Sequence, residues 1–93
     1  MGVTAARHAQ QVLSNTEKVV AIELLCGAQG LDCGEPIRPG QGVAAAYRCI
    51  RASVPPLRKD RVLAPDLGKL EGLLVSGKLV RQVQKVVPGL IPC

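Results

Sequence analysis

The chain has 93 residues, of which 47% are hydrophobic and one, Tyr47, is aromatic, and its formal net charge is +5. This length limits it to one domain, and Ala, Val and Leu must fill any interior because large aromatic side chains are missing. The positive charge is concentrated in residues 34–62, which hold six basic and two acidic groups. A basic region can attract phosphate, but we expect a solvated face or ion pairs, because neither an aromatic stacking platform nor zinc-finger spacing accompanies it.

The four cysteines occur at positions 26, 33, 49 and 93, without a CxxC pair or a Cys/His cluster. The N-terminal residues lack the apolar segment of a signal peptide, and no stretch reaches the ~18–20 apolar residues of a membrane span. We therefore expect reduced thiols in a cytoplasmic protein that binds neither a membrane nor a metal. Cys26 is predicted to be a buried small hydrophobe, and Cys93 to be the most exposed and most easily oxidised thiol.

Residues 1–30 are predicted to form one long helix with apolar side chains on more than one side, which is typical of a helix enclosed by others. A helix over residues 4–28 would be roughly 35–40 Å long, whereas a compact domain of this length is only about 30 Å across. The helix must therefore break or find partners outside the chain. Ser14–Thr16 could cap a shorter helix that begins near Glu17, and Gly30 is the predicted C-cap.

Glu23 stands alone inside the apolar string VVAIELLC. If other helices enclose this segment, the carboxylate is buried and needs a cation or hydrogen-bond donors. We favour an ion pair or a hydrogen bond to a neighbouring helix, and a role as a site carboxylate stays open as the alternative.

Residues 31–42 form a turn-rich linker, whose glycines lack the GxGxxG order of a phosphate-binding loop. Residues 43–54 are predicted to form the clearest amphipathic helix. Its apolar stripe follows helical spacing and consists of Val43, Ala46, Tyr47, Ile50 and Val54. We interpret Tyr47 as a core anchor with its hydroxyl at the surface rather than as an acid or base, because no nearby residue pairs with it.

A basic loop is expected at residues 55–64, with local charge pairing around Asp60. Residues 65–87 are predicted to form two short helices, separated by a stop at Ser76–Gly77, and residues 88–93 a non-helical tail. The apolar faces of these helices are Leu67, Leu70 and Leu74 in the first and Leu79, Val80, Val83, Val86 and Val87 in the second. The second is basic and amphipathic, and we expect it to dock on protein rather than on a membrane. The predicted fold is all-α, with one long helix followed by three shorter helices.

Several strings together resemble the C-terminal part of the histidine ammonia-lyases, in the aromatic amino acid lyase family. They are EKVVAIELLCGAQGLD (17–32), Pro-Ile-Arg-Pro-Gly (36–40), VPPLRKDRVLAPDL (54–67) and VSGKLV (75–80). The order and spacing of these blocks match over nearly the whole chain. They are scaffold strings, and none of them is a catalytic signature.

The resemblance implies an all-helical, homotetrameric cytoplasmic enzyme in which long helices from several subunits form a central bundle. Such enzymes eliminate ammonia from L-histidine to give urocanate. Their electrophile is a methylidene-imidazolone group that forms autocatalytically from an Ala-Ser-Gly triplet, while a positioned base removes a β-proton.

The sequence departs from this pattern because it contains no Ala-Ser-Gly: Ser53 lies in Arg-Ala-Ser-Val and Ser76 in Val-Ser-Gly-Lys. The methylidene-imidazolone cannot form from this chain, and no catalytic, cofactor-binding or metal-binding residue carries over to it. We therefore expect a truncated or fragmentary lyase region, a partial helical bundle that is inactive alone and that self-associates or binds a full-length lyase subunit. The alternatives are a helical interaction or oligomerisation module and, as a distant third, a basic nucleic-acid binder based on residues 38–61.

Overall fold

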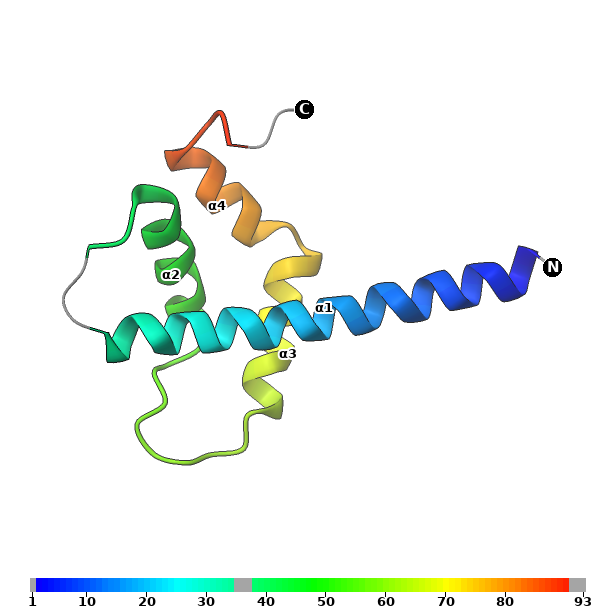
Figure 1. Cartoon of the computed structure of the whole chain (residues 1–93), viewed down its shortest axis with the longest axis horizontal. Helices are drawn as coiled ribbons and strands as arrows, with labels where there is room; N and C mark the ends of the chain where they lie inside the picture. Colours follow the sequence, from blue (N-terminus) through cyan, green and yellow to red (C-terminus); the bar gives the residue numbers. More distant parts are fainter. Residues whose placement is uncertain (1, 35–37, 91–93) are drawn as a thin grey trace.

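The computed structural model of the chain describes residues 2–34 and 38–90. Within these residues the chain forms helices joined by loops, without any strand (Figure 1). The helices are α1 (Gly2–Cys33), α2 (Gln41–Ser53), α3 (Ala64–Val75) and α4 (Lys78–Val86). The predicted all-α fold, with one long helix followed by three shorter ones, is confirmed. The predictions for Cys93, for part of the 31–42 linker and for the end of the 88–93 tail lie outside the described residues.

The first helix continues without a break through Ser14–Thr16 and past Gly30 to Cys33, so the predicted C-cap at Gly30 is wrong. The alternative of a break at Ser14–Thr16 is also wrong. The Thr16 hydroxyl donates to the carbonyl of Val12 at 2.8 Å. A side chain that is satisfied within its own helix in this way does not need to act as a cap.

The core lies where the second half of α1 crosses α3 and α2, while α4 packs against α2 (Figure 1). Its buried members are Ala21, Ala28, Cys49, Ile50, Val54, Leu70, Leu73 and Leu79. Leu70 and Val54 are the largest side chains that are fully enclosed. The interior is therefore built from small and aliphatic side chains, as the composition predicts.

The first half of α1 projects away from this body (Figure 1). Ala21 and Ala28 are the buried residues of α1, and both lie in its second half. The radius of gyration is 15.3 Å and the longest extent is 53 Å, whereas a compact chain of this length has a radius of gyration of about 12 Å. The mismatch between helix length and chain length is thus resolved by leaving half of the helix unpacked.

Two faces of α2 are buried, which the single predicted stripe does not describe. Ile50 and Val54 are buried as predicted, but Val43 is 53% exposed, and Ala45 and Cys49, which lie off the stripe, are buried. The reason is that α2 lies between α1 and α4 and contacts both.

Glycine suits two places around α4. A Cβ on Gly42, in the first turn of α2, would lie 3.3 Å from the side chain of Val87, so Val87 would have to shift slightly to accept a larger residue. Gly77 separates α3 from α4 and has a left-handed φ of +76°, which favours glycine. The predicted stop at Ser76–Gly77 is confirmed.

The predicted apolar faces of the last two helices are partly right. In α3, Leu70 is buried as expected, and Leu73, which was not predicted, is buried as well. In α4, Leu79 is buried, but Val80 remains 41% exposed. Among the helices of the described residues, none is both long enough and apolar enough to cross a membrane.

Candidate functional site

An exposed line of residues runs along α1 on the side away from the body. Its members follow alternating steps of four and three residues, the spacing of a helix–helix seam. They are Ala5, Ala9, Val12, Thr16, Val19, Glu23, Cys26 and Gly30, and all of them are exposed. Most are small or apolar, and Val12 and Val19 are 64% and 54% exposed. We call this line the α1 stripe. It is a surface with the pattern of an interface and with no other helix of the described chain on it.

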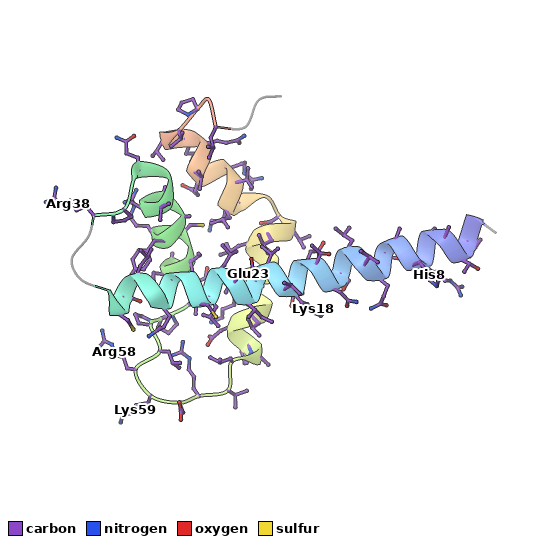
Figure 2. All side chains as sticks on the ribbon, viewed as in Figure 1. His8, Lys18, Glu23, Arg38, Arg58 and Lys59 are labelled. Carbon is purple, nitrogen blue, oxygen red and sulfur yellow. The ribbon has the colours of Figure 1, made fainter. Side chains whose placement is uncertain are left out.

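Two predictions depended on α1 being enclosed, and they differ from the structure. Cys26 is exposed rather than buried, because α1 meets the body through Ala21 and Ala28, on its other side. Glu23 is also exposed, midway along α1 (Figure 2). Within the described part of the chain its carboxylate forms no ion pair.

A groove of about 400 Å³ lies between α1 and α2. Its lining is almost entirely apolar and consists of Glu23, Leu24, Gly27, Ala28, Leu31, Val43, Ala46, Tyr47 and Ile50. Leu31 and Val43 remain 42% and 53% exposed. The groove borders the α1 stripe at Glu23, so a helix packed on the stripe would also cover part of it.

The last turn of α1 is joined to α2 by a polar network. The Tyr47 hydroxyl donates to one oxygen of Asp32, and the Arg51 guanidinium donates to the other at 2.5 Å. The same guanidinium lies 5.6 Å from the centre of the Tyr47 ring, within cation–π range. The turn of α1 beyond Gly30 places Asp32 opposite α2.

These partners change the acidity of Asp32. The hydrogen bond from Tyr47 is the main cause that holds the pKa of Asp32 below its ordinary value. Partial loss of hydration opposes this change, while Arg51 and the charge of Arg58 add to the lowering. The prediction that Tyr47 is a core anchor with its hydroxyl at the surface holds only in part, because the hydroxyl is bound. Sequence reasoning missed the partners since Asp32 precedes Tyr47 by 15 residues, beyond any local pattern.

The loop after α2 is tied down at two points. The Gln29 side chain donates to the Leu57 carbonyl at 3.1 Å and accepts from the Leu57 N–H at 3.0 Å. Arg61 binds the buried Asp66 at 2.9 Å, and it donates to the carbonyls of Pro55 and Pro56 at 2.7 and 3.1 Å.

The basic loop therefore owes its shape to a charge pair that was not predicted. The sequence suggested pairing around Asp60, but in the described chain Arg61 pairs with Asp66 in the first turn of α3. Arg58 and Lys59 point into solvent (Figure 2). The prediction of a solvated loop thus holds for Arg58 and Lys59 at its tip, but not for Arg61, which is paired with Asp66.

A second cleft, of about 360 Å³, lies between α2 and α4 and is basic. Its lining consists of Ala45, Arg48, Cys49 and Ala52 from α2, and Lys78, Gln82, Lys85 and Val86 from α4. We call it the α2–α4 cleft. Within the described residues, the chain has no cluster of three or more His, Cys, Asp or Glu side chains that could hold a metal ion, and Cys26, Cys33 and Cys49 are free thiols.

Comparisons with known proteins show the family of the chain. The family model for aromatic amino acid lyases matches residues 1–52, which include α1 and nearly all of α2, and the chain belongs to this family.

Individual relatives extend the match to nearly the whole chain. A histidine ammonia-lyase of Natranaerobius thermophilus is 47% identical over 87 residues, which are 94% of this chain and 17% of that protein. The histidine ammonia-lyase of Deinococcus radiodurans is 51% identical over 84 residues, 90% of this chain and 16% of its own length. The histidine ammonia-lyase of Symbiobacterium thermophilum is 51% identical over 86 residues, which are 92% of this chain and 17% of that protein. The chain thus spans about one sixth of the length of these relatives. No solved structure matches it.

Proposed function

We propose that this chain forms the C-terminal helical scaffold of a histidine ammonia-lyase-type enzyme and has no lyase activity by itself. Its relatives are histidine ammonia-lyases at 47–51% identity, and the resemblance implies elimination of ammonia from L-histidine to give urocanate. The sequence contains no Ala-Ser-Gly from which the methylidene-imidazolone electrophile could form. The electrophile and the base would therefore come from sequence outside these residues, and a cytoplasmic location is part of the same proposal.

The observation that carries this proposal is the exposed α1 stripe. A helix of 32 residues whose buried residues are confined to its second half has little tertiary packing to stabilise its first half. The alternating four- and three-residue spacing of small and apolar side chains suits close packing against another helix. We infer that the helices that pack on the α1 stripe are other helices of the lyase or those of a second copy of this chain.

The same stripe supports a second candidate function, a helical interaction or oligomerisation module that binds a full-length lyase subunit. Such an interface would have to accommodate the carboxylate of Glu23. A carboxylate that becomes buried needs a donor from the partner, and in the described chain it has no cation beside it.

The claim of inactivity is tested by incubating the purified chain with L-histidine and following urocanate by its ultraviolet absorbance. A full-length histidine ammonia-lyase serves as the positive control. We expect no urocanate above the rate of a buffer blank. Steady production that scales with the concentration of the chain would overturn the claim.

The scaffold role is tested by measuring the mass of the chain in solution with size-exclusion chromatography and light scattering. We expect self-association at tens of micromolar, because the exposed stripe has no partner within the described chain. The double variant Val12→Glu and Val19→Glu places charges in the seam and should yield a monomer. The matched control is Val62→Glu, at a 77% exposed loop position, which should associate as the unmodified chain does. A stable monomer at every concentration would refute self-association.

A further inference from the structure

We propose that the α2–α4 cleft binds a small anion of the polyphosphate class, a site independent of the lyase scaffold role. Three cationic side chains line it, Arg48 from α2 and Lys78 and Lys85 from α4. The two lysines are seven residues apart, so they lie on one side of α4 about 10 Å from each other along the helix. Arg48 lines the same cleft from α2, so residues of both helices bring positive charge to one cleft.

The charges of this cleft are not neutralised by the elements that form it. Neither α2 nor α4 contains a carboxylate, whereas together they contain Arg48, Arg51, Lys78, Arg81 and Lys85. Arg51 is neutralised by Asp32, and Arg81 donates to the Ser76 carbonyl at 2.9 Å. Arg48, Lys78 and Lys85 form no ion pair within the described part of the chain. A concave surface lined by one sign of charge concentrates ions of the opposite sign.

The size and lining of the cleft suit a small anion that carries phosphate groups. Its volume of about 360 Å³ is at the lower end of the range of about 300–1,000 Å³ for small-molecule sites. Small side chains, Ala45 and Cys49, form its buried part, so a ligand can approach the α2 backbone. Arg48 offers the planar fork that binds phosphate through two hydrogen bonds, and the half-buried Gln82 adds an amide.

A nucleic-acid strand is a poorer match than a small polyphosphate. Base stacking requires an aromatic face, and Tyr47 is the single aromatic residue of the chain. Tyr47 lies on the α1 side of α2, where it binds Asp32, and is not among the residues that line the cleft. The cleft thus offers positive charge but no aromatic side chain on which a base could stack.

The test is isothermal titration of the 93-residue chain with inorganic pyrophosphate at low ionic strength. We expect saturable binding at one site per chain that weakens as salt is added. Arg48→Gln and Lys85→Gln should each weaken binding about tenfold, since each removes a charge-assisted hydrogen bond. Lys59→Gln removes the same charge at an exposed loop position outside the cleft, and it should change the affinity less than about twofold.

A second measurement locates the anion without relying on variants. Lys85 lines the cleft and Lys59 lies in the loop outside it, and both are exposed. Bound pyrophosphate should therefore slow acetylation of Lys85, followed by mass spectrometry of peptides, and leave that of Lys59 unchanged. Three results would overturn the proposal: no saturable binding, equal weakening by Lys59→Gln and Arg48→Gln, or equal slowing of acetylation at Lys85 and Lys59. Tighter binding of a short single-stranded oligonucleotide than of pyrophosphate would also overturn it, in favour of a strand-binding surface.

Discussion

The two halves of α1 belong to one continuous helix, yet the second half is packed and the first half is largely exposed. The second half packs through Ala21 and Ala28 onto α3 and α2, and its last turn is fixed by Asp32. The first half has apolar side chains as well, but Val3, Val12 and Leu13 are 59–68% exposed. A helical pattern therefore indicates how residues are arranged around the axis, and the presence of neighbours decides whether they are buried.

The largest expected effect comes from making the same substitution in the packed and the projecting parts. Leu70 is fully buried and Leu13 is 59% exposed. Leu70→Ala should lower the free energy of unfolding by about 2–5 kcal/mol, because it opens a cavity in the core, whereas Leu13→Ala should change it by about 0.5 kcal/mol or less. Urea unfolding followed by circular dichroism measures both. Equal losses would mean that the projecting half is packed as firmly as the core.

The next effect concerns the loop that joins α2 to α3. Arg61→Gln removes the partner of the buried Asp66 and two hydrogen bonds to the carbonyls of Pro55 and Pro56. Because Arg61 is 30% exposed, the cost should be below that of a fully buried pair, about 1–3 kcal/mol in the free energy of unfolding. Arg58→Gln, which removes an exposed charge from the same loop, is the control and should be nearly neutral. A similar loss in both variants would show that loop charge rather than this pair matters.

A smaller effect is expected where α1 holds the loop through Gln29. Gln29→Ala deletes both hydrogen bonds to the Leu57 backbone and should reduce the free energy of unfolding by about 1–2 kcal/mol. Gln10→Ala makes the same change on the exposed, projecting half of α1, where alanine favours the helix slightly. If Gln10→Ala destabilised the chain as much, the contrast between the two halves would fail.

These effects also show what local patterns in the sequence could predict. Helical spacing and turn residues predicted the four helices and the stop at Ser76–Gly77, because both signals depend on residues a few positions apart. The spacing of the residues in the α1 stripe can likewise be seen in the sequence. Their exposure cannot be predicted from that spacing, because burial depends on which elements pack on α1. This is why the prediction for Cys26 was wrong.

Contacts between distant parts of the chain were beyond local patterns. Asp32 with Arg51 and Gln29 with Leu57 join residues 19 and 28 positions apart. The α2–α4 cleft depends on the docking of two helices: its Arg48 lies 30 and 37 positions before Lys78 and Lys85. The sequence shows these residues only as scattered charge. The family was predictable, since it rests on strings of residues rather than on contacts.

The smallest expected effect is a pH dependence at the joint between α1 and α2. The pKa of Asp32 is lowered by the hydrogen bond from Tyr47 and by Arg51, so the folded chain binds this proton more weakly than the unfolded chain does. The resulting stabilisation is complete above the ordinary pKa of 3.8 and is lost as the pH falls through the lower folded value. Since Asp32 lies near the surface, water screens much of the interaction.

Asp32→Asn removes this titration and should reduce the loss of stability between about pH 5 and about pH 2, measured as the urea midpoint. At neutral pH the variant should be slightly less stable, because Tyr47 and Arg51 lose their carboxylate partner. Asp60→Asn is the matched control, since Asp60 is exposed and forms no ion pair within the described chain. It should keep the pH profile of the unmodified chain. If both variants kept that profile, the network of Asp32 would not stabilise the packed half of α1 against acid.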